Sequence, residues 1–223
     1  MGGWTGVWLG MPPPRGASFS HDALLDAAEA VIHEEGIGNL TLDAVAARAR
    51  VSKGGLLHHF PTKEKLLEAM VRRIVDSWYR NAIAAIGGMQ PRPGRVVRGV
   101  MSLCLDRADC GNETLHRSSF VLVTALVNNP KLVQPLRDVH RELQKQAARD
   151  GLPPGVGESV LLALDGLWFE QIFGLHEMTA LRRAKISSAL HRFLEMSRAS
   201  EQSRQRRASV RRKRRINTRK ATP

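Results

Sequence analysis

An all-α fold is predicted for this chain of 223 residues. From residue 20 onward, apolar side chains recur at the helical period of about 3.6, and alternating polar and apolar stretches with β-branched bias are missing. Hydrophobic residues make up 43% of the chain, which is enough for one or two modest cores and too much for a chain disordered throughout. Residues 1–17 combine a run of prolines with several glycines and are predicted to form a flexible leader, in which either Met1 or Met11 is the start.

The first two helices are marked by capping residues. Ser20 can cap a helix that ends at Gly36. One face of this helix is apolar, with Leu24, Leu25, Ala28, Val31 and Ile32. Thr41 is the expected N-cap of the second helix, and Leu40 stands where it can pack on Val45 as a hydrophobic staple.

Residues 40–59 have the pattern of a helix-turn-helix. After a tight turn, a third, short helix is predicted over Lys53 to His59. The small side chain of Ala46 lets the two helices approach each other, and Val51 with Leu56 fills the angle between them. In such a pair the second helix lies in the major groove of DNA, while the first crosses the backbone.

The residues expected on the outer surface of the third helix are suited to binding DNA. Hydrogen-bond donors come from Ser52, Lys53, His58 and His59. Gly54 and Gly55 each cost roughly 1 kcal/mol of helix stability relative to alanine. Helix stability therefore does not explain this pair of glycines. A helix whose backbone must come close to phosphates or base edges does explain it. Thr41 and Lys63 can add phosphate contacts at the starts of the second and fourth helices.

Two consecutive segments carry a family resemblance: the helix TLDAVAARA and the run VSKGGLLHHFPTKEKLL, which covers residues 51–67. Together they resemble the DNA-binding head of the TetR family of bacterial transcriptional regulators. The resemblance implies an all-α, Ω-shaped homodimer, in which three N-terminal helices bind DNA and a variable helical C-terminal domain binds a small molecule and dimerises. The DNA contacts of the family map onto Thr41, Ser52, Lys53, Gly54, Gly55, Leu57, His58, His59 and Lys63.

Two residues depart from the family pattern. Leu57 stands where many members have tyrosine, which puts a hydroxyl contact to phosphate in doubt. Arg50 stands where glycine is common in the turn. A non-glycine residue in a left-handed turn costs roughly 1 kcal/mol, but an arginine there can add a cation near the DNA backbone.

The rest of the chain is predicted to be helical up to residue 197. Thr62 is the expected cap of a fourth helix that can extend to Ile86. Further helices are predicted over residues 96–108, 113–128, 131–149, 157–175 and 181–197. We expect residues 18–64 to form the DNA-binding domain and residues 65–197 to form a helical domain for ligand binding and dimerisation.

Residues 160–175 are apolar on nearly every side, so we expect this helix to be covered from two directions. A partner chain can supply the second cover in a four-helix bundle, where Gly166 would permit close approach. The bundle is expected to include Leu181, Ile186, Leu190, Phe193 and Leu194. The expected dimer-interface residues are Leu161, Leu164, Trp168 and Phe193.

A small-molecule site is expected inside the C-terminal domain. Trp168 and Gln171 can face a cavity whose walls include Met101 and Phe120. The simpler interpretation, that the apolar members of this set fill the core, is favoured for each residue taken alone. The four residues are therefore the predicted ligand contacts, with the core interpretation left open.

Several classes of protein are disfavoured. Cys104 and Cys110 are too few for a disulfide framework and lack zinc-site spacing, and the adjacent His58 and His59 cannot close on one metal ion. No complete catalytic or dinucleotide signature is present, so we expect no enzyme, metal or cofactor. The chain opens with no secretory signal, and residues 160–175 are shorter than the roughly 20 residues of a membrane span. A cytoplasmic location without a membrane partner is expected.

The net charge of +13 is concentrated at the C-terminus. Residues 198–223 contain 11 basic side chains against one acidic, whereas residues 1–197 contain 23 against 20. Self-repulsion predicts an extended, disordered tail. Two interpretations stay open for it: a solvated appendage, or an arm that adds nonspecific, salt-dependent affinity for DNA.

The sequence therefore predicts a transcriptional regulator that binds a palindromic double-stranded operator as a homodimer. We expect a repressor that is released by a small-molecule effector of unknown identity. One alternative is an activator or nonspecific basic DNA-binding protein that needs no effector. A remote alternative is a helical metal-dependent hydrolase.

Overall fold

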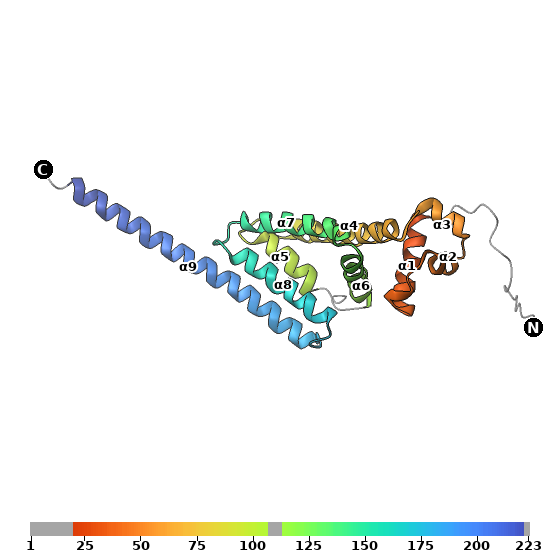
Figure 1. Ribbon diagram of the computed structural model, residues 1–223. Coiled ribbons are helices and arrows are strands. Elements are labelled where there is room, and N and C mark those ends of the chain that lie inside the picture. The colour runs from red at the N-terminus through yellow and green to blue at the C-terminus, as the bar shows by residue number, and fades with distance from the viewer. Residues whose placement is uncertain (1–19, 107–112, 221–223) are drawn as a thin grey trace, which may run out of the picture. The chain divides into compact units, whose positions relative to one another are not determined.

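The computed structural model of the chain describes residues 20–106 and 113–220, with their side chains except at residues 37, 113–118 and 204–220. The leader predicted over residues 1–17 and Cys110 lie outside the described residues. Every regular element in the described ranges is a helix, which confirms the predicted fold class (Figure 1).

The α-helices are α1 (His21–Glu35), α2 (Leu42–Ala49), α3 (Lys53–His59), α4 (Lys63–Gly88), α5 (Arg95–Met101), α6 (Glu113–Asn128), α7 (Gln134–Ala148), α8 (Val156–Ile172) and α9 (Ala180–Lys220). Two short 3-10 helices, η1 (Ile37–Asn39) and η3 (Pro130–Val133), precede α2 and α7. The helix predicted over residues 96–108 changes character after Met101, where the π-helical turn η2 (Ser102–Asp106) continues the chain.

The first helix has the ends that its sequence predicts. The Ser20 hydroxyl accepts a hydrogen bond from the N–H of Ala23 at 3.2 Å. At the other end Gly36 adopts φ +82°, a backbone conformation that side chains disfavour, and its N–H donates to the carbonyl of Ile32 at 3.1 Å. The helix therefore begins and ends for local reasons.

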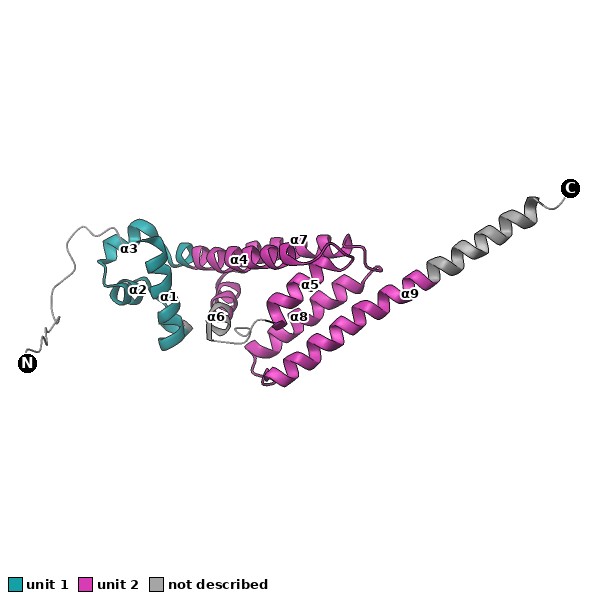
Figure 2. Cartoon of the chain, turned by 180° about the vertical axis from the view of Figure 1, so that it is seen from behind, with its two compact units in different colours: residues 1–66 teal, residues 67–223 magenta. Residues whose placement is uncertain are grey.

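The chain divides into two compact units, residues 1–66 and 67–223 (Figure 2). In the first unit α1 packs on α2, and α2 packs on α3. The buried core of this unit includes Leu24, Leu25, Ala28, Val31, Ile32, Leu40, Val45, Leu56, Phe60 and Leu66. The apolar face predicted for α1 is thus the face that is buried.

In the second unit α8 lies between α5 and α9 and also packs on α7 (Figure 2). The core of this unit contains Val97, Val100, Met101, Leu105, Leu143, Ala147, Val160, Leu161, Leu164 and Leu194. Gly157 allows α8 to approach α7 closely, because a Cβ at this position would lie 2.9 Å from the carbonyl oxygen of Ala147. Gly166, in contrast, is exposed, and a Cβ there would meet no atom within 4 Å.

The last helix differs from the extended, disordered tail that the charge predicts. α9 continues past Ser197 to Lys220. Neither glycine nor proline occurs from residue 181 to residue 220, so no residue breaks the helix that starts in the core. Arginine, which is the most frequent residue of this stretch, is a good helix former, as are its alanine, leucine and lysine residues.

Candidate DNA-binding site

The turn between α2 and α3 is held by local backbone hydrogen bonds. The Thr41 hydroxyl caps α2 by accepting a hydrogen bond from the N–H of Ala44 at 3.1 Å. At the other end Arg50 adopts the left-handed conformation, with φ 56° and ψ 39°. The N–H groups of Arg50 and Val51 donate to carbonyls of the last turn of α2 at 3.1 and 3.0 Å. The turn is therefore tight although the residue in its left-handed position is not glycine.

Helix α3 has one buried anchor and an open outer surface. The Ser52 hydroxyl accepts a hydrogen bond from the N–H of Gly55 at 3.1 Å, so its capping role is confirmed. Leu56 is fully buried, whereas Ser52, Lys53, Gly54, Gly55 and His58 are exposed. The side of α3 opposite Leu56 is thus accessible to a large partner.

The two glycines of α3 differ in the space around them. A Cβ on Gly54 would meet no atom within 4 Å, while a Cβ on Gly55 would lie 3.3 Å from the Ser52 hydroxyl. Internal packing therefore does not require glycine at position 54. The open backbone leaves room for another molecule to approach it.

Lys53 is held in place by a partner on α2. Its Nζ lies 2.9 Å from Oδ1 of Asp43, and the two side chains are 59% and 67% exposed. An exposed pair of this kind is worth less than about 1 kcal/mol. A phosphate group can therefore replace Asp43 at little cost, while the pair keeps the lysine oriented in the absence of DNA.

The two histidines of α3 have different surroundings. His58 is exposed, whereas His59 is half-buried beside Phe60, with 6.4 Å between ring centroids. His21, at the start of α1, lies against the same phenylalanine at 4.7 Å. His59 therefore contributes to packing between α1 and α3 as well as to the outer surface. The contact of His21 with Phe60 could not be predicted from the sequence, because no local pattern links residues this far apart.

The other predicted contacts lie at helix starts. Thr41 is exposed before α2, and Lys63 is half-buried as the first residue of α4. The Thr62 hydroxyl accepts a hydrogen bond from the N–H of Lys65 at 3.2 Å, which confirms Thr62 as a cap. Leu57 is half-buried on α3. All nine predicted DNA contacts lie in the first unit, on the segment from residue 41 to residue 63.

A further ion pair, which no sequence pattern predicted, supports this unit. Arg48 of α2 makes a bidentate pair with Glu34 of α1, with Nη2 and Oε1 2.6 Å apart. The hydrogen bond and charge of Glu34 raise the pKa of Arg48 above its ordinary value. The pair links α1 to the helix that precedes the turn.

Comparison with known proteins connects this geometry to one family. Residues 24–70 match the family model described as bacterial regulatory proteins, tetR family. Residues 94–195 match the model described as tetracyclin repressor-like, C-terminal domain. The chain belongs to the TetR family. It is therefore a DNA-binding transcriptional regulator with a helix-turn-helix.

Curated TetR-family relatives include two regulators from Escherichia coli. BetI is 29% identical over 170 residues, which cover 71% of this chain and 85% of BetI. RutR is 39% identical over 64 residues, which cover 29% of this chain and 30% of RutR. The higher identity is thus confined to a segment about as long as the DNA-binding head.

Solved structures share the fold. A transcriptional regulator from a Rhodococcus species has a TM-score of 0.60 at 23% identity, covering 80% of this chain and 96% of its own. The multidrug binding protein EbrR, solved with malachite green, has a TM-score of 0.56 at 22% identity, covering 78% of this chain and 96% of its own.

The four residues predicted to contact a ligand have unequal exposure. Met101 is fully buried in the core of the second unit, as the alternative interpretation expected. Phe120, on α6, is 49% exposed, and Trp168 and Gln171 on α8 are half-buried. None of the four lines the cavity described below.

The four predicted dimer-interface residues differ in how far they are exposed. Leu161 and Leu164 are 4% and 6% exposed because both belong to the core of their own chain, so little of either is left for a partner to cover. The exposed large apolar residues here are Leu162 and Phe169 on α8 and Phe173 directly after it. Trp168 is half-buried, and Phe193 on α9 is 41% exposed. The first two residues of the predicted interface thus lie on the inner side of α8, and the interface itself stays a prediction.

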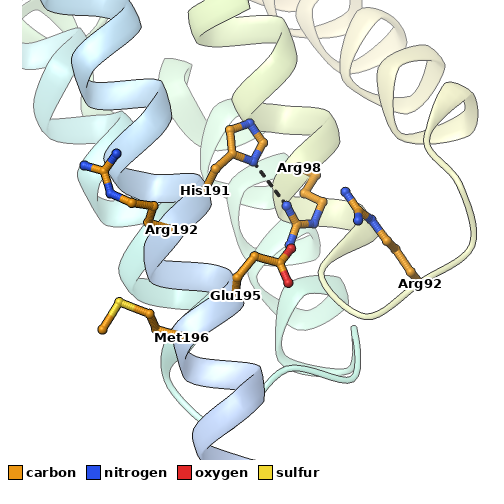
Figure 3. A pocket seen from close by; sticks show the side chains of 6 residues that line it. All are labelled: Arg92, Arg98, His191, Arg192, Glu195 and Met196. Atoms are coloured by element: carbon orange, nitrogen blue, oxygen red, sulfur yellow. Dashed lines mark hydrogen bonds and ion pairs between the residues drawn. The ribbon is translucent and has the colours of Figure 1, made fainter.

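A cavity of about 390 Å³ lies beside α9, lined by Arg92, Arg98, His191, Arg192, Glu195 and Met196. Figure 3 shows His191 and Glu195 turned toward the guanidinium of Arg98, with Arg192 and Met196 on the other side of α9. Arg98 is 3% exposed; its Nη2 donates to Oε1 of Glu195 at 2.7 Å, and its Nη1 lies 3.1 Å from Nδ1 of His191. Burial lowers the pKa of Arg98, and the charge of Arg92 lowers it further.

Among the side chains that the structure describes, no group of three His, Cys, Asp or Glu residues is arranged to hold a metal ion. In the same part of the chain, no helix has both the length and the apolar character that crossing a membrane requires.

Proposed function

We propose that this TetR-family regulator represses transcription by binding a palindromic operator through α3. The observation that carries the proposal is the open outer surface of this helix, where Ser52, Lys53, Gly54 and His58 are exposed around a buried Leu56. Side chains and backbone on such a short helix can contact base edges and phosphates in the major groove. Thr41 and Lys63 add candidate phosphate contacts at the neighbouring helix starts.

Footprinting on the DNA beside its own gene tests the proposal, because regulators of this kind often act there. Lys53→Ala and His58→Ala should each abolish protection while leaving the thermal unfolding midpoint unchanged. His59→Ala should also weaken protection, but its half-buried ring makes it a less clean test. Lys131→Ala, an exposed cation on the second unit, is the matched control and should protect as well as the natural protein. Equal protection by the Lys53→Ala variant would contradict the proposal.

The active form is proposed to be a homodimer that pairs through α8 and α9. Leu162, Gly166 and Phe169 on α8 and Phe173 directly after it are all exposed and recur at helical spacing. Phe193 and Met196, which are 41% and 71% exposed, add to this apolar surface on α9. A second copy of the chain suits this surface because a palindromic operator requires two heads related by twofold symmetry.

Sedimentation analysis of charged variants tests the dimer. Phe169→Glu should shift the protein to monomers and lower its operator affinity. Val127→Glu changes a residue that is 78% exposed on α6 and should leave the dimer intact. A dimer that withstands both substitutions would mean that another surface pairs the chains.

We propose that a small molecule binds the C-terminal domain in the cytoplasm and releases the regulator from its operator. Solved neighbours were crystallised with malachite green and with triclosan, so domains of this fold accept aromatic compounds. An effector shifts the equilibrium only by its difference in affinity for the bound and released states. Gln171→Ala should therefore weaken effector-induced release without changing operator affinity in the absence of effector. Trp168→Ala should also weaken release, and sedimentation must show that this variant remains a dimer, because Trp168 is also a predicted interface residue. Operator release that is unaffected by either substitution would move the site elsewhere, and the cavity beside Arg98 is then the next candidate.

A further inference from the structure

The C-terminal part of α9 is a basic helix that the family match does not include. The match to the C-terminal domain ends at residue 195, whereas α9 continues to Lys220. Residues 198–220 contain 11 basic side chains and one acidic side chain, Glu201. At 1.5 Å per residue this segment is about 35 Å long, roughly the length of one turn of double-stranded DNA.

This charge works against the helix when no partner is present. Cations that are four residues apart neighbour each other on a helix and destabilise it by about 0.2–0.5 kcal/mol per pair. Such a series runs through Arg207, Arg211, Arg215 and Arg219. Apolar packing cannot compensate here, because the stretch has only four apolar residues, and they do not share one helical face: Ala199, Ala208, Val210 and Ile216. A polyanion would remove the repulsion and stabilise the helix.

The distribution of the charge favours DNA over a lipid surface. A helix that lies on a membrane needs an apolar face opposite its basic face, and this segment has cations at positions all around the helical turn. The major groove is wide enough for a helix and is bordered by phosphates on both sides. Cations on every side of a helix match such a groove.

We propose that residues 198–220 of α9 form a second DNA-binding element, a basic helix that binds phosphates without sequence preference. This goes beyond the proposed operator recognition by α3 and does not depend on it. Each phosphate that the helix neutralises releases counterions, so the logarithm of affinity falls with the logarithm of salt by about 0.9 per contact. The basic helix thus raises affinity for any duplex and makes that affinity strongly salt-dependent.

The first test compares two variants of the full-length chain, each with five substitutions. One variant changes Arg211, Arg212, Lys213, Arg214 and Arg215 to glutamine. Its matched control changes Lys131, Arg137, Arg141, Lys145 and Arg149, which are exposed on η3, α7 and the residue after α7, and so lowers the net charge equally. Affinity is measured for a 30-base-pair duplex that contains no operator, between 50 and 200 mM salt.

In the tail variant, the slope of the logarithm of affinity against the logarithm of salt should be smaller by about 4. Over this salt range, that difference amounts to roughly a 250-fold change in affinity. The control should keep the slope within about 1 of the natural protein. Equal slopes for all three proteins, or equal losses in both variants, would overturn the proposal. Loss of binding to vesicles of anionic phospholipid, with an unchanged slope on DNA, would also overturn it and identify a membrane as the partner.

A second pair of variants tests whether the helix itself matters. Ser209→Pro breaks the helix without changing any charge, and Ser209→Ala preserves it. Ser209→Pro should weaken duplex binding at least five-fold, and Ser209→Ala should not. If Ser209→Pro leaves duplex binding unchanged while the variant with five tail substitutions weakens it, the segment acts as a flexible polycation and the helical element is refuted. Because the duplex lacks an operator, failure of this proposal is distinguishable from failure of the footprint of α3.

Discussion

Gly99 of α5 faces the backbone of Ile86 in α4, and a Cβ on Gly99 would lie 2.6 Å from the Cα of Ile86. This distance is shorter than any ordinary carbon–carbon contact, so the two helices can adopt this separation only with glycine at position 99. The hydrogen bond from Nε of Arg95 to the Ile86 carbonyl, at 2.9 Å, joins the same two helices. The contact shows how one backbone position limits the geometry of the second unit.

Gly99→Ala should therefore destabilise the protein by about 1–3 kcal/mol, since overpacking against backbone forces the helices apart. Gly88→Ala is the control, because a Cβ there would meet no atom within 4 Å. Chemical denaturation measures both variants. Similar unfolding midpoints for the two substitutions would show that α4 and α5 adjust without strain.

Gly54→Ala separates stability from DNA binding. Alanine at this position of α3 should raise the free energy of unfolding by about 0.5–1 kcal/mol, because it has higher helix propensity and meets no atom. The same methyl group should lower operator affinity at least ten-fold if DNA approaches the backbone there. Gly87→Ala, in an equally open position at the end of α4, should leave affinity unchanged. Calorimetry and fluorescence anisotropy on the same samples give the two readouts.

Arg50→Gly should also affect the two properties in opposite directions. Glycine relieves the left-handed backbone at φ 56°, which is worth about 1 kcal/mol of stability. Loss of the cation should reduce the salt dependence of operator binding by about 1 if the side chain contacts a phosphate. Arg50→Asn, which tolerates this backbone conformation, should behave in the same way. An unchanged salt slope would assign Arg50 no role in DNA contact.

Glu195→Gln tests the pair that joins α9 to α5. The guanidinium of Arg98 is buried and would keep only a weaker, neutral acceptor, so unfolding should become easier by about 2 kcal/mol. Glu142→Gln makes the same chemical change at an exposed site and should cost less than about 0.5 kcal/mol. A Glu195 variant as stable as this control would mean that water satisfies Arg98 equally well.

Asp150 gives a pH-dependent prediction. Its Oδ2 accepts a hydrogen bond from the N–H of Val96 at 2.6 Å, at the start of α5. Burial raises the pKa of Asp150, and backbone N–H groups of α5 only partly oppose this shift. The folded state therefore holds the proton more tightly than the unfolded state, and the contribution of Asp150 to stability falls as pH rises from about 4 through the folded-state pKa.

Asp150→Asn keeps an acceptor for Val96 but removes the titration. The unfolding free energy of this variant minus that of the natural protein should be larger at pH 7 than at pH 4. Asp150→Ala also removes the titration and leaves the N–H of Val96 without a cap, so it should be about 1 kcal/mol less stable than Asp150→Asn at both pH values. Urea unfolding at the two pH values measures these differences. A difference between the asparagine variant and the natural protein that does not change with pH would show that Asp150 titrates normally.

The DNA-binding head could be predicted in detail because its determinants are local. Ser20, Thr41 and Ser52 each cap the helix that they precede, and Arg50 adopts the left-handed conformation that its place in the turn requires. Each of these features depends on residues within about four positions along the chain. Even so, the packing of His21 against Phe60 was out of reach, since it joins α1 to the end of α3 across a distant stretch of sequence.

The sequence by itself determined the helices, their caps, the turn and the family, because hydrogen bonds and hydrophobic period act over a few residues. Only the tertiary structure decided which side of α8 faces inward, burying Leu161 and exposing Leu162. A helix that is apolar all around carries no period from which that choice could be read. The tertiary structure likewise decided that α9 continues into the basic segment, because a helix already anchored in a core by Leu194 needs no new nucleus in order to extend.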